Sequence, residues 1–529
     1  MHDARPAAAA AGPPLTRRIL LQGGVALGLA AAGSLVRPFD TSPLARAMNG
    51  AGRDDWAAFD RAIQAATQRF GIVGAAVGVV NAAGLVHQRT FGVRDLATGA
   101  PVTPHTLFRV ASTTKGMTAL LVAQFVDEGR LDWDQPVREV WPAFRAPTPE
   151  LTATLRGRDL LGMATGLGAR PLVDLQQGYP TPQELLESVA WLPVLGPPHT
   201  QFFYNNTVYA VGGYLPALAL GAEPQELLTV HTQQMQERVF GPAGMATARK
   251  ADDPRPFSDD YATGYALDFE QGMAAEPWVT VGSFAPVGGT MASLTDMAAY
   301  VILQLRGGTT AAGQRVVSAQ NLAECWKPVI AIPLPPDATS DVSDVSYCMG
   351  WTSAVYGTGR RVLSHMGGED GFTCNIAFLP EDDLGLVVLT NAGNAPNGTP
   401  FCGYTLNLLL EHRFALNADP QDAVVSGYEA AASHLADQAA QAVPVAPTAI
   451  ASFLGYYEEG FRLAFDAAGA LRLHLQNRAW RVLGQPDGGY VVGSGLLVGA
   501  VINLTRDAVG VPLLELQDFA TVRWQSGLG

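Results

Sequence analysis

Ser112 and Lys115 are the residues whose types and spacing point most directly to chemistry. They stand three positions apart at the start of a segment in which apolar residues recur at helical spacing up to Gly129. This pattern predicts a helix that begins near Ser112 and ends at the glycine. Residues three apart on a helix share one face, so we expect the serine hydroxyl and the lysine amine to lie close together.

A serine hydroxyl is a weak nucleophile at neutral pH, and a buried lysine can lose its charge and accept the hydroxyl proton. The helix N-terminus would also favour a developing oxyanion. The alternative is an ordinary S-x-x-K tetrapeptide on a solvated helix. With eighteen serines and three lysines in 529 residues, chance alone predicts about 0.1 such pairs. The pair is therefore a candidate nucleophile with its base.

A second polar group, Tyr204 and Asn206, precedes an apolar stretch at 208–220 that is typical of a helix. In the simpler interpretation Asn206 caps this helix and Tyr204 packs against it. In the functional interpretation, a nearby lysine stabilises the phenolate of Tyr204, which can then relay the proton of the nucleophile. The residues alone leave both interpretations open.

A third group is the run from His365 to Gly368, which precedes an apolar strand. A single histidine before glycines is usually a loop residue, so its significance depends on the other two groups. By contrast, Ser293 and Asp296 fit a capping box, and we interpret them as structural.

The surrounding pattern predicts one large mixed domain and one small β domain. β-Rich runs joined by glycine turns indicate two hairpins, and the chain between them is mostly helical. An Ala/Pro-rich stretch then marks a boundary, and short alternating runs follow it. The predicted ranges are a helix at 54–70, hairpins at 73–92 and 372–389, helices over 155–250, a large mixed domain at 48–425, a linker at 426–449 and a β-barrel-like domain at 450–529.

Composition limits the classes of protein and partner. The chain has 529 residues, of which 48% are hydrophobic and 16% charged, so it can bury a sizeable core. A net charge of −14 argues against nucleic acid or an anionic membrane surface as a partner. The four cysteines are widely spaced, without a metal-binding pattern, and we expect buried free thiols and no metal or cofactor.

The first 47 residues have the features of an export signal. Arg17 and Arg18 precede a weakly apolar, glycine-containing run, and residues 44–47 form a small-x-small cleavage site. These features are typical of a twin-arginine signal peptide. We therefore expect a periplasmic or extracellular protein, with an uncleaved membrane anchor as the alternative.

Three separated motifs together carry a resemblance to a known family. In chain order they are S-x-x-K at Ser112 and Lys115, Y-x-N at Tyr204 and Asn206, and H-x-G at His365 and Gly367. Over roughly residues 55–410 the chain resembles the serine penicillin-recognising hydrolases. These include class C β-lactamases, penicillin-binding proteins such as DD-peptidases, D-aminopeptidases and related esterases.

The resemblance implies a role for each motif. Ser112 would be the acylated nucleophile, and Lys115 and Tyr204 would share the acid and base work. Asn206 would contact Lys115 and the amide of the substrate. His365 would lie on the strand opposite.

The resemblance also implies an oxyanion hole and a fold. The backbone N–H groups of Ser112 and Gly368, the residue after Gly367, would stabilise the oxyanion. The implied fold is α/β of the α+β type, an antiparallel sheet flanked by helices, with a helical lobe over the site. The C-terminal β domain lies beyond the region of resemblance.

Two departures from the family pattern affect the expected function. Class C β-lactamases have a lysine where this chain has His365, and many relatives read H-T-S-G where residues 163–166 read M-A-T-G. A histidine is mostly neutral at pH 7, so the substrate carboxylate of a β-lactam would lose a partner. We expect an exported serine hydrolase acting through an acyl-enzyme on peptides, amides or esters. The alternatives are a class C-like β-lactamase and a non-catalytic envelope module.

Overall fold

The computed structural model describes residues 56–169, 180–334, 342–357, 359–414, 419–517 and 520–525. The predicted signal peptide, residues 1–47, lies outside these ranges. Within them, no helix combines the length and the apolar character needed to cross a membrane.

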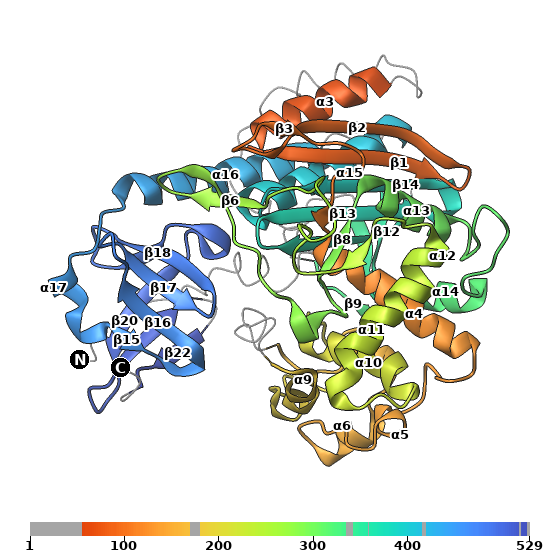
Figure 1. Ribbon diagram of the computed structural model, residues 1–529, viewed down its shortest axis with the longest axis horizontal. Coiled ribbons are helices and arrows are strands. Elements are labelled where there is room, and N and C mark those ends of the chain that lie inside the picture. The colour runs from red at the N-terminus through yellow and green to blue at the C-terminus, as the bar shows by residue number, and fades with distance from the viewer. Residues whose placement is uncertain are drawn as a thin grey trace, which may run out of the picture.

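A nine-stranded antiparallel sheet forms the centre of the larger domain (Figure 1). Its strands, in spatial order, are β3 (Ala100–Pro101), β2 (Gly84–Asp95), β1 (Gly74–Asn81), β14 (Leu384–Thr390), β13 (Phe372–Leu379), β12 (Arg360–Glu369), β11 (Thr352–Tyr356), β10 (Val342–Tyr347) and β9 (Ile330–Ala331). The two predicted hairpins are present, and β1 pairs with β14, so the first and last parts of the domain meet in the sheet. All residues of β13 and β14 are buried, as expected for central strands covered on both faces.

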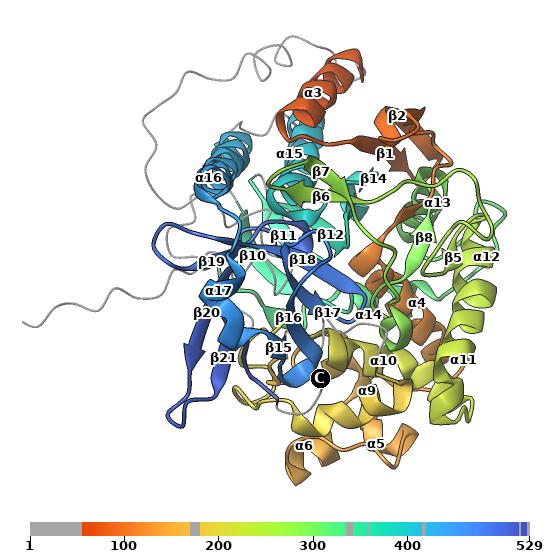
Figure 2. The same cartoon turned by 60° about the vertical axis from the view of Figure 1, so that its left-hand side comes forward.

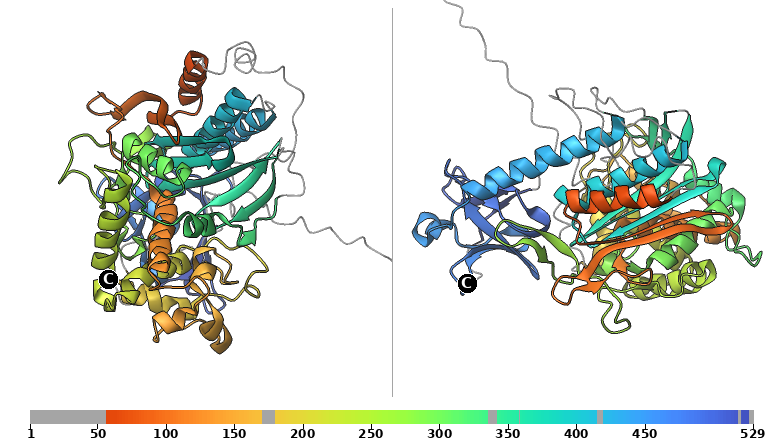
Figure 3. Two further views of the ribbon diagram at one scale, coloured as in Figure 1. Left: turned by 90° about the vertical axis from the view of Figure 1, so that its right-hand side faces the viewer. Right: turned by 90° about the horizontal axis from the view of Figure 1, so that it is seen from above.

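Helices cover both faces of this sheet (Figure 3). α3 (Trp56–Arg69) packs against α15 (Thr399–Phe414), which contacts β13. α13 (Leu294–Leu305) contacts β1 and β14. α13 begins at the capping box of Ser293 and Asp296 that its sequence predicts.

A helical lobe lies beside the sheet. It contains α5 (Val137–Val140), α6 (Pro149–Thr154), α7 (Gly157–Leu161), α9 (Pro182–Ser188), α10 (Asn206–Ala219) and α11 (Leu227–Gln234). The central helix of the lobe, α10, contacts α4 (Thr114–Asp127) of the larger domain. This contact brings the start of α10 towards the start of α4.

The C-terminal part forms a second hydrophobic core of its own. α16 (Asp419–Gln441) occupies much of the predicted linker, packs against α15 and runs out towards this second domain (Figure 3). The four cysteines, all in the first domain, are buried as free thiols.

The second domain is an eight-stranded antiparallel meander (Figure 2). Its strands are β15 (Gly455–Tyr456), β16 (Phe461–Phe465), β17 (Leu471–Leu475), β18 (Arg478–Gly484), β19 (Tyr490–Val492), β20 (Val501–Arg506), β21 (Pro512–Leu516) and β22 (Ala520–Arg523). A bridge between Tyr457 and Trp524 joins the two ends of the meander, so the sheet curls into a half-barrel. Alternate residues of β17 are buried, which is the pattern predicted from its sequence.

Candidate active site

Ser112 lies in a tight turn between a short strand and a long buried helix. β4 (Phe108–Arg109) pairs with β8 (Thr290–Ala292), and a 3-10 turn at Ala111–Thr113 leads into α4. Ala111 has a positive φ of 45°, a strained conformation for a residue with a side chain and one often found at functional sites. Ser112 is half-buried, so its hydroxyl remains accessible.

Lys115 is fully buried and directed at the serine. Its Nζ donates a hydrogen bond to Ser112 Oγ at 2.9 Å, as the spacing of the two residues predicts. The amine also lies 4.9 Å from the ring centre of Tyr204 and 5.7 Å from that of Tyr209. Two aromatic faces therefore shield this lysine from water.

Tyr204 completes a three-residue cluster on the serine hydroxyl. Its hydroxyl donates to Ser112 Oγ at 3.1 Å. Two groups able to accept and return a proton thus contact the same oxygen, which is the arrangement of an activated nucleophile.

The structure assigns different positions to the two adjacent asparagines. Asn205, not Asn206 as the simpler interpretation had it, caps α10, and its side chain accepts from the N–H of Val208 at 3.1 Å. Asn206 is the first residue of α10, and its Oδ1 atom is buried without a hydrogen-bond partner. An unpaired buried acceptor is costly, so Asn206 Oδ1 is suited to accept from a bound substrate.

His365 is buried on β12, 6.4 Å from the ring of Tyr204 between centroids. Burial, followed by the positive charge of Lys115, lowers the pKa of His365 to about 3, so the ring is neutral at pH 7. Nδ1 lies 2.5 Å from the carbonyl oxygen of Met366 and therefore carries the proton it donates there. Nε2 must then accept from the hydroxyl of Tyr347 at 3.2 Å, and burial raises the pKa of Tyr347 and keeps this hydroxyl protonated.

Gly367 and Gly368 bring β12 against the serine turn. A Cβ atom on Gly367 would lie 2.5 Å from the carbonyl oxygen of Val110 and 3.0 Å from the amide nitrogen of Ser112, so a side chain would not fit there. The next residue, Gly368, is packed against the side chain of Asn394. The two predicted oxyanion donors, Ser112 N–H and Gly368 N–H, therefore belong to adjacent segments.

A buried ion pair that none of the sequence motifs indicates joins these two segments. Arg109, three residues before Ser112, contacts Glu369, the residue after Gly368, through Nη1 and Oε1 at 2.9 Å. Burial raises the pKa of Glu369, and the charge of Arg109 opposes this effect. The signal that could have indicated the pair is the position of both charges, since each lies within three residues of a predicted site residue.

A second, half-buried lysine supports the same region. Lys250 Nζ donates to the carbonyls of Ala285 and Gly288, and burial lowers the pKa of Lys250 to about 7 against the opposing effect of nearby carboxylates. The carbonyl of Val287, between them, lies 3.5 Å from Lys115 Nζ. Lys115 and Lys250 thus both contact the loop at residues 285–288.

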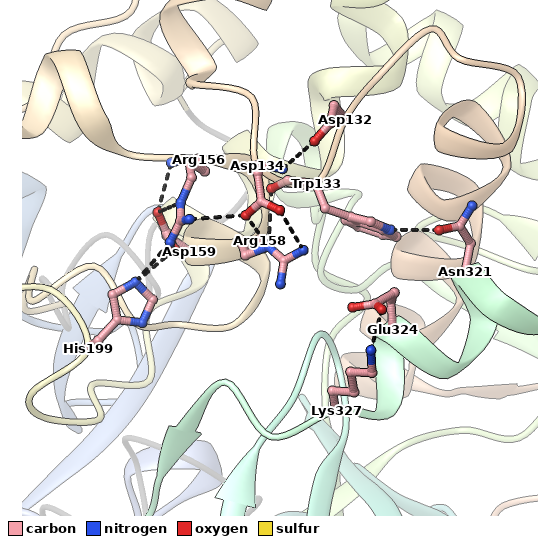
Figure 4. A network of polar contacts seen from close by, with 10 residues as sticks. All are labelled: Asp132, Trp133, Asp134, Arg156, Arg158, Asp159, His199, Asn321, Glu324 and Lys327. Atoms are coloured by element: carbon pink, nitrogen blue, oxygen red, sulfur yellow. Dashed lines mark hydrogen bonds and ion pairs between the residues drawn. The ribbon is translucent and has the colours of Figure 1, made fainter.

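A polar network holds the segment that leads to Tyr204 (Figure 4). His199 Nε2 lies 3.0 Å from Asp159 Oδ1, and Arg156 Nη2 donates to the same oxygen at 3.1 Å. The N–H of His199 also bonds to the carbonyl of Ala164, within the segment that replaces H-T-S-G. In this chain the 163–166 segment therefore anchors the loop before Tyr204.

Among the described residues, no cluster of three or more histidine, cysteine or carboxylate side chains could hold a metal ion. The site brings together a serine, an amine and a phenol, which are groups that can take part in acyl transfer.

Comparison with known proteins gives one family. The family described as Beta-lactamase matches residues 59–411. The chain is 28% identical over 361 residues to unguisins hydrolase ungD of Aspergillus violaceofuscus (strain CBS 115571), covering 64% of this chain and 62% of that protein. It is 26% identical over 347 residues to a β-lactamase of Escherichia coli (strain K12), covering 62% and 85% of the two chains.

The match therefore spans about three fifths of the length of the fungal relatives. The solved octameric penicillin-binding protein homologue from Pyrococcus abyssi has a similar fold, with a TM-score of 0.57 at 19% identity. That match covers 88% of this chain and all of the other, so it extends into the C-terminal half-barrel.

Proposed function

Since this chain belongs to the β-lactamase family, we propose that it is a serine hydrolase that forms an acyl-enzyme on Ser112 with peptide, amide or ester substrates. The observation that carries this proposal is the cluster on one oxygen. Ser112 Oγ lies 2.9 Å from Lys115 Nζ and 3.1 Å from the hydroxyl of Tyr204.

Acylation begins when Ser112 Oγ attacks the carbonyl carbon of the substrate. Lys115 accepts the hydroxyl proton, and Tyr204 passes a proton to the departing amine or alcohol. The carbonyl oxygen becomes an oxyanion, which the N–H groups of Ser112 and Gly368 stabilise. The product of this step is an ester between Ser112 and the acyl group.

Deacylation repeats these steps with water as the nucleophile. The water lies near Tyr204 and Lys115, gives up a proton to this pair, and attacks the ester carbon. Ser112 Oγ leaves and recovers its proton from the same pair. Removal of one oxyanion donor typically lowers kcat by about 10²- to 10³-fold, so the rate depends strongly on the position of Gly368.

The neutral His365 favours peptides, amides and esters over β-lactams. A dedicated β-lactamase of this type presents a cation to the substrate carboxylate, whereas the pKa of about 3 leaves His365 uncharged at neutral pH. One of the relatives is named a hydrolase of unguisins and another a β-lactamase. The neutral charge at residue 365 is what supports a peptide, amide or ester substrate over a β-lactam.

The test is covalent labelling followed by a substrate screen. A fluorophosphonate probe should label the peptide that contains Ser112, and Ser112→Ala should abolish the label. Ser188→Ala, at a serine on α9 outside the site, is the matched control and should label normally. Labelling that survives in Ser112→Ala would place the reactive nucleophile elsewhere and overturn the proposal. No labelling of the wild type at all would favour the non-catalytic envelope module.

The screen compares p-nitrophenyl esters, D-amino acid amides, D-Ala-D-Ala peptides and nitrocefin on the mature protein. We expect the highest kcat/KM on an ester, amide or peptide. A clear preference for nitrocefin would instead support the β-lactamase alternative.

We also propose export through the twin-arginine route to the periplasm or beyond. Arg17 and Arg18 before the mild apolar run motivate this proposal. Replacing both arginines by lysine should leave the precursor in the cytoplasm. Normal export of that variant would indicate another route.

A further inference from the structure

The two domains are joined by a buried, bidentate ion pair. Arg478, the first residue of β18 in the half-barrel, donates through Nε to Asp370 Oδ1 at 3.1 Å and through Nη2 to Asp370 Oδ2 at 2.9 Å. Both side chains are only 5% exposed. A charge this deeply buried requires its partner, because water cannot replace it.

Asp370 directly follows β12, the strand that contains the predicted oxyanion donor Gly368. It belongs to the two-residue turn, with Gly371, that joins β12 to β13, and it follows Gly368 by two residues. In the strand between them the backbone is held by regular ladder bonds to β13, so a shift of the turn is transmitted to Gly368. The predicted oxyanion donor therefore lies close to the point where the second domain is attached.

The turn has few other attachments to the first domain. Its Gly371 carbonyl accepts from the N–H of Tyr265, the first residue of β6 (Tyr265–Asp268). The β6 hairpin itself is bound to the half-barrel, since Phe269 N–H donates to the carbonyl of Gly493 at 2.8 Å. The half-barrel thus holds the turn directly through Arg478 and indirectly through β6. β6 lies between the half-barrel and the first domain in Figure 1.

The buried pair Arg109–Glu369 links this turn to the serine segment. Arg109 also donates to the carbonyls of Asp252 and Val279, at 2.5 Å each, so it is fixed to the body of the first domain. Glu369 is thus held from the serine side and its neighbour Asp370 from the half-barrel side.

From this arrangement we propose that Arg478 is a positioning residue for the oxyanion hole: through Asp370, the C-terminal half-barrel fixes the end of β12 and with it the N–H of Gly368. The proposal rests on the proposed serine hydrolase function. It assigns the second domain a role in the chemical step.

The chain offers a matched control on the same strand. Arg481, also on β18, forms an ion pair with Glu270, a first-domain residue in the turn of the hairpin that β6 makes with β7 (Gly272–Ala275). This pair also joins the two domains, but Glu270 is half exposed and is not part of β12. Arg481→Ala therefore removes an inter-domain ion pair on the indirect connection through the β6 hairpin and leaves the direct contact between Arg478 and Asp370 in place.

The experiment measures kcat and KM on the best ester, and the inhibition constant of a phenylboronic acid. Boron bonds to a serine oxygen to form a tetrahedral adduct, which uses the oxyanion donors as the transition state does. For Arg478→Lys, which keeps the charge but loses the planar bidentate contact, we expect kcat to fall about tenfold to a hundredfold with KM little changed. The boronate inhibition constant should rise in parallel, and Arg481→Ala should stay within about twofold of wild type.

The unfolding midpoint of each variant is measured, so that a loss of activity is not mistaken for a loss of folding. Asp370→Asn combined with Arg478→Gln replaces the ion pair by a neutral pair of similar shape, and both variants are assayed below their unfolding midpoints. Wild-type kcat and boronate inhibition in these folded variants, or an equal loss in Arg481→Ala, would overturn the positioning role. Failure of the wild type to label at Ser112 would overturn the proposed function itself, so the two failures are distinguishable.

Discussion

The charge at residue 365 should determine which substrates the protein prefers. His365 is buried and neutral, with a pKa of about 3. Nitrocefin carries a carboxylate next to the bond that breaks, whereas a simple p-nitrophenyl ester carries none. His365→Lys should therefore raise nitrocefin turnover relative to ester turnover.

The expected change in the nitrocefin-to-ester ratio can be worked out from Coulomb's law. A cation about 4 Å from a carboxylate, at an effective dielectric constant of about 20, contributes about 4 kcal/mol. Burial of the ammonium group opposes this gain, and so does repulsion from Lys115, whose charge already lowers the pKa of His365. If only a third of the attraction remains, about 1.4 kcal/mol, the nitrocefin-to-ester ratio of kcat/KM still rises about tenfold.

The same cation would also act on Tyr204. At the 6.4 Å that separates the two rings, Coulomb's law with a dielectric constant of about 20 gives about 2.6 kcal/mol in favour of the phenolate. Ester turnover in His365→Lys can therefore change too, which is why the ratio and not either rate is the readout.

The assay compares wild type, His365→Lys and the neutral control His365→Gln on nitrocefin and the best ester at pH 7. The nitrocefin-to-ester ratio of kcat/KM should be higher in His365→Lys than in His365→Gln, and the ratio in His365→Gln should resemble that of wild type. Equal ratios in both variants would show that charge is not the determinant. If wild type already hydrolyses nitrocefin with a kcat/KM above that of its best ester and amide, the neutral-histidine reasoning is wrong.

Three further predictions concern single side chains. Lys115→Ala should abolish turnover of nitrocefin and of esters alike, because it removes the proton acceptor 2.9 Å from the nucleophile; measurable ester turnover in a folded variant would shift the base role to Tyr204. Tyr347→Phe should lower the free energy of unfolding by about 1–3 kcal/mol in urea denaturation, because Nε2 of His365 loses its donor; an unchanged midpoint would contradict the assigned tautomer. Burial raises the pKa of Glu276 from 4.5 to about 7, so between these values the folded protein keeps a proton that the unfolded chain releases. Its contribution to stability is complete below pH 4.5 and is lost as the pH rises through 7; Glu276→Gln should flatten this decline in unfolding experiments at pH 5 and 8, and an identical pH profile would refute it.

Local spacing was enough to predict the contact between Ser112 and Lys115. Residues three apart at a helix start are neighbours whatever the rest of the chain does. The contact of Tyr204 with the serine depends on how α10 packs on α4, and only the resemblance to a family supplied it. The alternation of apolar residues and the glycine turns likewise predicted the two hairpins and a C-terminal domain made of β-strands.

Other features depend on details that a pattern cannot resolve. Asn205 and Asn206 are both good N-cap residues, and only the backbone geometry shows that the first of them caps α10. The hydroxyl of Tyr347 that satisfies His365 comes from a different strand. No spacing rule connects these residues, since their contact follows from the pairing of β10, β11 and β12.

The buried charges show where sequence reasoning could be extended. Only 16% of the residues are charged, yet Arg109, Glu369 and Asp370 stand within three positions of predicted site residues. A charge so close to a buried site must be neutralised by a partner, so its presence predicts a second buried charge elsewhere in the chain. The fold determines where that partner lies: for Glu369 it is Arg109, 260 positions away, and for Asp370 it is Arg478 in the other domain. The half-barrel therefore contacts the end of β12 through Asp370. The sequence indicates that this charge needs a partner, although it does not identify the partner.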